Sequence, residues 1–104
     1  MKQQECAQKA IQLLEPIPED QFIAYIFTDK RGKCCARGHI IRLMSSNPQD
    51  YSIDNCSGLW NDNPIDRCLG YGTLGDVNNG NHYKYQEPEI KTRVMHYLND
   101  LINQ

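Results

Sequence analysis

The sequence predicts an α+β fold: three helices packed on a small antiparallel hairpin or sheet, with a long connection rich in glycine and asparagine. Three observations lead to this prediction. Apolar residues recur at helical spacing in three segments, one continuous apolar run has the length of a strand, and no comparable periodicity covers residues 47–86. A chain of 104 residues is expected to form a single domain, spanning residues 1–104.

The first helix is expected over residues 3–14. Its apolar side chains recur every three or four positions, which places them on one face: Cys6, Ala7, Ala10, Ile11 and Leu14. The helix should end at Glu15, because Pro16 pushes the residue before it out of the α region.

A hairpin is expected next. Residues 21–28 are mostly apolar, aromatic or β-branched and show no polar alternation, which is typical of a central strand covered on both faces. Residues 29–32 should form a turn in which Gly32 takes a positive φ. Residues 33–36 can then return as a short second strand.

Two further helices are expected, over residues 36–46 and 88–102. Gly38 weakens the first by about 1 kcal/mol relative to alanine. Pro88 suits the first position of the second. The apolar stripe of this last helix consists of Ile90, Val94, Tyr97, Leu98 and Leu101. Its opposite, polar side is expected to hold Arg93, His96 and Asp100.

The connection over residues 47–86 contains five of the seven glycines and seven of the nine asparagines. A structureless loop of this length is uncommon in a compact domain, so a short helix is expected around residues 54–60. Residues 77–81 are expected to turn, because the pair Asn79-Gly80 favours type I′ geometry.

Composition excludes several classes of partner. A net charge of −2, from 11 basic and 13 acidic residues, argues against a nucleic-acid-binding protein, which usually has a basic face. No apolar run approaches the roughly 20 residues of a membrane span, so no membrane association is expected. Residues 1–14 lack the features of an export signal. The expected location is therefore a bacterial or phage cytoplasm, with all five cysteines as free thiols.

One motif suggests a thiol-dependent enzyme. Residues 54–58 read Asp-Asn-Cys-Ser-Gly, which is similar to the Asp-Cys-Ser-Gly nucleophile motif of NlpC/P60 cell-wall peptidases. The resemblance implies Cys56 as nucleophile and a later histidine, here His82, as base. Asn55 interrupts the motif, so this hydrolase is an alternative to the main hypothesis.

Two other patterns concern cofactors and metals. Residues 70–77 match the glycine spacing of a dinucleotide-binding loop, but an Asn-Asn-Gly turn follows where a helix is needed, so no cofactor is expected.

Cys35 and His39 are four residues apart and could share a helical face as metal ligands. No Cys-x-x-Cys pair accompanies them, so a zinc-stabilised adaptor is a further alternative. Other soft-metal ligands are Cys34, Cys56, Cys68, His82 and His96.

The main hypothesis is a non-catalytic binding or interaction module, because no acid–base or nucleophile constellation stands out. Its partner would be a small polar ligand or a protein. A ligand is expected where residues 68–82 meet the start of the 36–46 helix, since glycines permit close backbone approach and helix-start amides attract anions. The expected binding residues are Arg37, His39, Gly70, Gly72, Asn78, Asn79 and His82.

The order of motifs resembles a family of small, uncharacterised bacterial proteins, a domain of unknown function. Its pattern is an N-terminal helix, a strand and turn, then Gly-x-x-Cys-x-x-Gly-Ala-Ile opening a helix. Residues 32–40, Gly-Lys-Cys-Cys-Ala-Arg-Gly-His-Ile, are similar to that opening. A Leu-Gly segment, an Asn-Asn-Gly turn and a closing helix follow at residues 69–70, 78–80 and 93–98. Trp60-Asn61-Asp62 competes with residues 77–80 for the family's aromatic-Asn-Asp turn. The resemblance implies a fold outline and no activity.

Overall fold

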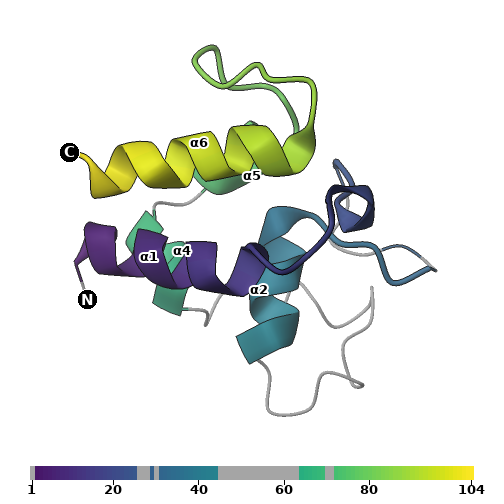
Figure 1. Ribbon diagram of the computed structural model, residues 1–104, viewed down its shortest axis with the longest axis horizontal. Helices are drawn as coiled ribbons and strands as arrows, with labels where there is room; N and C mark the ends of the chain where they lie inside the picture. Colours follow the sequence, from purple (N-terminus) through teal and green to yellow (C-terminus); the bar gives the residue numbers. More distant parts are fainter. Residues whose placement is uncertain (1, 26–28, 30, 45–63, 70–71) are drawn as a thin grey trace.

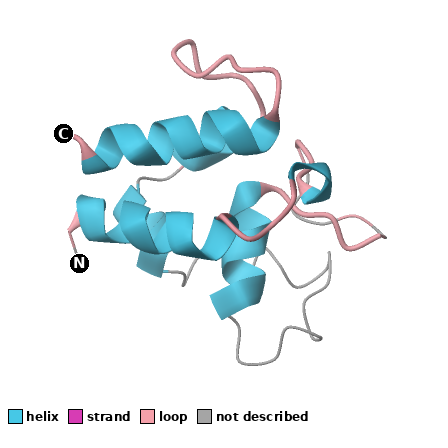
Figure 2. Cartoon of the chain, in the orientation of Figure 1, coloured by secondary structure: helices cyan, strands magenta, loops and turns pink. Residues whose placement is uncertain are grey.

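The computed structural model describes residues 2–25, 29, 31–44, 64–69 and 72–104. This part of the chain is helical (Figures 1 and 2). Its elements are α1 (Gln3–Leu14), the short 3-10 helix η1 (Glu19–Gln21), α2 (Ala36–Met44), α4 (Pro64–Leu69), α5 (Thr73–Asn78) and α6 (Ile90–Ile102). No strand occurs among these described residues, so the predicted α+β fold is wrong.

In the described part of the predicted hairpin, the pairing consists of one isolated bridge. Phe22 pairs with Cys34 in the parallel sense, whereas a hairpin requires antiparallel pairing. Three residues after Phe22, Tyr25 takes a φ of 71°, which turns the backbone out of an extended conformation. The apolar character of this segment is used instead by packing, since Phe22 is buried in a core made by helices. The rest of the predicted strand, residues 26–28, lies outside the described residues.

The core lies between α1 and α6, which run side by side, with the shorter helices packed around them (Figure 1). The predicted apolar faces of both long helices are confirmed, although Ile11 and Ile90 lie only partly buried at the edge of the core. The buried residues of the two helices are Cys6, Ala7, Ala10, Leu14, Val94, Tyr97, Leu98 and Leu101. Ile40, Ile65, Leu69, Leu74 and Val77 complete the core from the three shorter helices.

The start of α6 is held by residues distant in the sequence. A Glu19 carboxylate oxygen accepts a hydrogen bond from the Lys91 backbone N–H at 2.7 Å. The Lys91 ammonium donates to the Glu15 carbonyl oxygen, also at 2.7 Å. Glu19 thus satisfies an unpaired amide at the positive end of α6, and Lys91 joins that end to the chain leaving α1.

The Asn79-Gly80 pair ends a helix instead of forming the predicted type I′ turn. Gly80 takes a φ of 76°, its N–H donates to the Val77 carbonyl, and the Asn81 N–H donates to the Asp76 carbonyl. This pair of bonds is the Schellman motif of a helix C-terminus. The chain does turn here, but the predicted type I′ geometry is wrong: Asn79 is right-handed, with a φ of −85°, and Gly80 alone is left-handed, because α5 precedes the pair.

A disulfide joins Cys6 of α1 to Cys68 of α4, with Cα atoms 6.3 Å apart and a sequence separation of 62 residues. The expectation that all five cysteines are free thiols is therefore wrong. Cys34 and Cys35 are buried and take no part in this disulfide. The helix predicted around residues 54–60 lies outside the described residues.

Candidate functional site

The structure brings α5 to the start of α2, where a ligand was predicted to bind. Asn78 is fully buried there. Its side-chain oxygen accepts a hydrogen bond from the Ala36 N–H at 2.8 Å, and its amide nitrogen donates to the Ile23 carbonyl at 2.9 Å. The Asn79 side-chain oxygen accepts from the Tyr25 N–H at 2.7 Å. Both asparagines therefore join the end of α5 to the backbone of distant segments: Asn78 to the start of α2 and to Ile23, and Asn79 to Tyr25.

Two other members of the predicted ligand set lie beside α5. The Arg37 side chain crosses Gly75, where an added Cβ would lie 3.4 Å from a guanidinium nitrogen. Gly72 precedes α5 with a φ of 83°, a conformation that favours glycine. Gly70 lies outside the described residues.

His39 is buried on α2. Its Nε2 lies 2.8 Å from the Gln21 carbonyl oxygen, which can only accept, so Nε2 carries the proton. Its Nδ1 is buried without a hydrogen-bond partner among the described residues. Burial lowers the pKa of His39, so the ring is neutral near pH 7. It packs against Phe22 with ring centroids 4.8 Å apart.

Cys35 precedes α2, and its sulfur accepts a hydrogen bond from the Gly38 N–H at 3.3 Å. Burial raises its pKa to about 11, so the thiol is protonated at neutral pH. A reactive cysteine needs the opposite shift, towards the thiolate. Within the described ranges, no group of three or more histidine, cysteine or acidic side chains could hold a metal ion. Cys56, the alternative nucleophile, lies outside those ranges.

His82 contacts a different part of the molecule, the segment of residues 82–87, here called the aromatic loop. Tyr83 stacks on His82 at 5.0 Å, and His82 packs against Tyr85 at 4.9 Å. Tyr85 in turn meets His96 and Tyr97 of α6 edge-on, at 4.8 and 5.5 Å. These rings connect the exposed loop to the helix beneath it.

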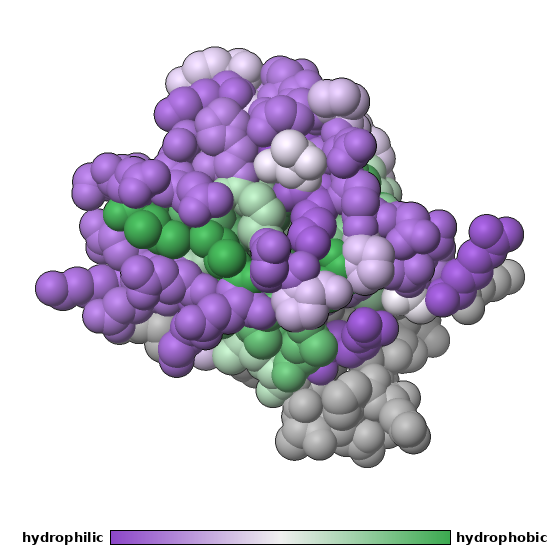
Figure 3. Space-filling model, in the orientation of Figure 1, coloured by the Kyte–Doolittle hydropathy of each residue, from purple (hydrophilic) through white to green (hydrophobic). Residues whose placement is uncertain are grey.

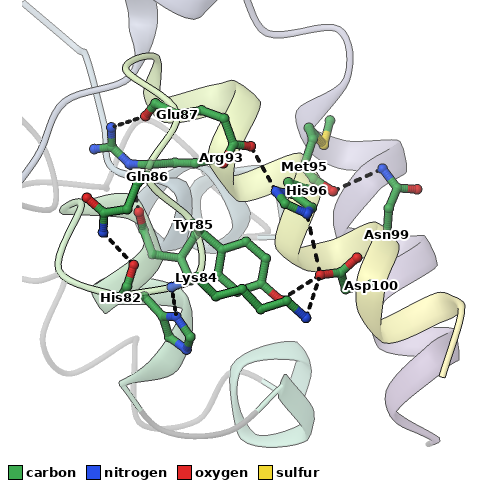
Figure 4. Close-up of polar contacts among 11 residues, drawn as sticks. His82, Lys84, Tyr85, Gln86, Glu87, Arg93, Met95, His96, Asn99 and Asp100 are labelled. Atoms are coloured by element: carbon green, nitrogen blue, oxygen red, sulfur yellow. Dashed lines mark hydrogen bonds and ion pairs between the residues drawn. The ribbon is translucent and has the colours of Figure 1, made fainter.

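Asp100 of α6 binds three side chains through one carboxylate oxygen, Oδ2 (Figure 4). The Tyr85 hydroxyl donates to it at 2.9 Å, the Lys84 ammonium lies 3.2 Å away, and His96 Nε2 lies 3.6 Å away. The Tyr85 hydrogen bond is the main reason that the pKa of Asp100 is below its usual range. Burial, together with this bond, raises the pKa of Tyr85 to about 12. The loop is thus attached to α6 by an ionised carboxylate and a neutral phenol.

His96 lies between two carboxylates. Its Nδ1 is 2.9 Å from a Glu87 oxygen of the aromatic loop, and its Nε2 faces Asp100, one turn further along α6 (Figure 4). His96 and both carboxylates are partly exposed, so water screens these contacts.

Arg93 joins the end of α5 to the chain that enters α6. Its Nε donates to the Val77 carbonyl at 2.8 Å, and a terminal nitrogen donates to the Asn78 carbonyl. The other terminal nitrogen donates to the Glu87 carbonyl at 3.1 Å. Arg93 is buried, so the prediction that it lies on a polar, exposed side of the last helix is wrong. The carbonyls at the negative end of α5 accept hydrogen bonds from the positively charged guanidinium, and this stabilisation permits its burial. In the sequence, the sign that Arg93 could be buried was its position directly before Val94, at the edge of the apolar stripe.

Tyr83 is 88% exposed, although the residues around it are fixed. Besides the ring contacts, the Gln86 side-chain amide donates to the His82 and Gly80 carbonyls. The aromatic loop extends beyond α6 (Figure 1), and its surface on the face shown in Figure 3 is hydrophilic. The loop therefore presents one tyrosine among polar groups of both charges.

Comparison with protein-family models, curated proteins and solved structures finds no match. Among the helices of the described part, none combines the length and apolar character needed to cross a bilayer.

Proposed function

We propose that this chain is a non-catalytic interaction module that binds a protein partner through the aromatic loop and the adjacent face of α6. One observation supports this most directly: Tyr83 is 88% exposed on a loop whose other residues are fixed by ring contacts and hydrogen bonds.

The physical reason lies in the cost of association. Tyrosine offers a large contact area with few rotatable bonds and is enriched among the residues that dominate binding energy. A loop fixed before binding loses little further conformational freedom when the partner arrives. Around Tyr83, the polar side chains of Lys84, Glu87 and His96 offer donors and acceptors for the polar rim typical of protein interfaces.

The compartment is part of this proposal. Disulfides persist in oxidising compartments and are rare in the cytosol. The Cys6–Cys68 bond therefore supports function in an oxidising compartment, in place of the cytoplasm expected from the sequence. Trapping thiols during cell lysis and then mapping peptides should find these two cysteines cross-linked. Their alkylation in freshly lysed cells would support the cytoplasm instead.

The partner can be sought with a matched pair of variants. Wild-type protein, Tyr83→Ala and Tyr25→Ala are immobilised and exposed to extracts of the source cells. Tyr25 is also exposed, at 70%, but belongs to the segment before α2, so it controls for the loss of any surface tyrosine. We expect a protein that wild type and Tyr25→Ala retain, and that Tyr83→Ala binds at least about tenfold more weakly, the loss typical of an interface anchor.

The same proteins also test the alternatives. Equal retention of every bound protein by Tyr83→Ala would contradict the proposed surface. Rapid alkylation of Cys56 near neutral pH would favour a thiol-dependent enzyme, and stoichiometric zinc in the purified protein would favour the metal-stabilised adaptor.

A further inference from the structure

The aromatic loop contains a histidine whose contact requires the neutral ring. The Lys84 backbone N–H donates to His82 Nδ1 at 3.2 Å. A ring nitrogen accepts a hydrogen bond only when it carries no proton. Protonation of His82 would therefore remove this contact and loosen the turn that presents Tyr83.

His96 has the opposite arrangement. Both of its ring nitrogens face carboxylates, Glu87 from the loop and Asp100 from α6. A neutral ring can donate from only one nitrogen, whereas a protonated ring donates from both and attracts each carboxylate. Protonation of His96 would therefore strengthen the attachment of the loop to α6.

Asp100 and Tyr85, which share these contacts, keep their charge state over the pH range in which imidazoles titrate, between about pH 5 and 8. The Tyr85 hydroxyl keeps the pKa of Asp100 below its usual range, so this carboxylate stays ionised. Tyr85 stays neutral, because its pKa is raised to about 12. Lys84 binds Asp100 from the loop side and adds positive charge there.

We propose that pH exchanges the contacts that hold the aromatic loop: protonation of His96 adds a contact to α6, and protonation of His82 removes one within the loop. At lower pH the loop would then lose the hydrogen bond to His82 within its own turn and gain a stronger contact with His96 of α6. The consequence for partner binding rests on the proposed function, since it is the presentation of Tyr83 that changes. The exchange of contacts itself is a property of the chain alone.

The test uses amide hydrogen exchange of the isolated protein at pH 5.5 and 7.5. The reporter is the Tyr85 amide, which donates to the His82 carbonyl at 3.1 Å within the turn. Its rate is divided by the intrinsic rate at each pH, and the amide of Leu98 in the core reports changes in global stability. Two variants separate the histidines: His82→Gln retains only the His96 contact, and His96→Gln retains only the His82 contact.

The two variants should respond with opposite signs. In His82→Gln, the Tyr85 amide should exchange about two- to fivefold more slowly at pH 5.5 than at pH 7.5, as expected for an exposed ion pair. In His96→Gln it should exchange faster at pH 5.5, by a similar factor, as expected for the loss of one exposed hydrogen bond. Adding Glu87→Gln to His82→Gln should remove most of the slowing.

Responses of the same sign in the two variants, or none in either, would overturn the proposal. So would slowing that persists unchanged in the double variant, because Glu87 would then not be the group that His96 binds. None of these outcomes bears on whether Tyr83 binds a partner. Likewise, a failed partner search leaves the exchange measurement intact.

Discussion

Reduction of the Cys6–Cys68 disulfide should lower the free energy of unfolding by about 4 kcal/mol. The bond closes a loop of 62 residues, and the loop-entropy relation for a cross-link of that length leads to this magnitude at room temperature. Domains of this size usually have a total stability of about 5–15 kcal/mol, so the bond accounts for a large share.

Urea unfolding of oxidised and reduced wild-type protein measures this difference without changing any side chain. For a slope between about 1 and 2 kcal/mol per molar urea, the midpoint should fall by about 2–4 M on reduction. Peptide mapping before unfolding should find Cys6 and Cys68 joined in the oxidised sample.

The double variant Cys6→Ala/Cys68→Ala is the control. It should unfold at lower urea than oxidised wild type, and the reductant should not change its midpoint. If the reductant destabilises the variant as much as it destabilises wild type, a different disulfide is responsible for the loss of stability. Equal midpoints for oxidised and reduced wild type would refute the reasoning outright.

Three further predictions concern buried and exposed side chains. Arg93→Met should cost about 2–4 kcal/mol in urea unfolding, because the four carbonyls of Val77, Asn78, Glu87 and Pro88 lose their donor; a loss below 0.5 kcal/mol would contradict it. Leu98→Ala should cost about 2–5 kcal/mol and His96→Ala well under 1 kcal/mol, and equal large losses would show that the buried face of α6 is misassigned. The pKa of His39 is lowered in the folded state, so the unfolded chain takes up this proton first on acidification. Stability should therefore fall as the pH drops below about 6.5, and His39→Gln should flatten that dependence in urea titrations at pH 7.5 and 5.5.

The sequence by itself determined the three longest helices and, for α1 and α6, which of their faces are apolar. Periodicity at three- and four-residue spacing predicted residues 3–14 and 88–102, close to the observed α1 and α6. The helix predicted over 36–46 begins at Ala36, as α2 does, in spite of Gly38. These predictions succeeded because a helix forms its hydrogen bonds within one segment, so its apolar pattern is local.

The predicted strand shows where local patterns stop being informative. A short apolar run can be buried as a strand or against helices, and of residues 21–25 it is Phe22 that packs into the helical core. Strand pairing depends on a second segment in register, and among the described residues only Phe22 and Cys34 pair. The left-handed backbone of Tyr25 could not be predicted from the sequence either, because tyrosine rarely takes a positive φ.

The remaining features depend on tertiary structure alone, because their partners are far apart in the sequence. Cys6 meets Cys68 only once α4 packs on α1. Arg93 can be buried only because the end of α5 and the chain before α6 direct carbonyls at it. His96 has Asp100 beside it on the same helix, but it gains Glu87 only when the aromatic loop folds back over α6. Helical periodicity specifies a face for each segment, but the contacts between segments depend on how those faces pack in three dimensions.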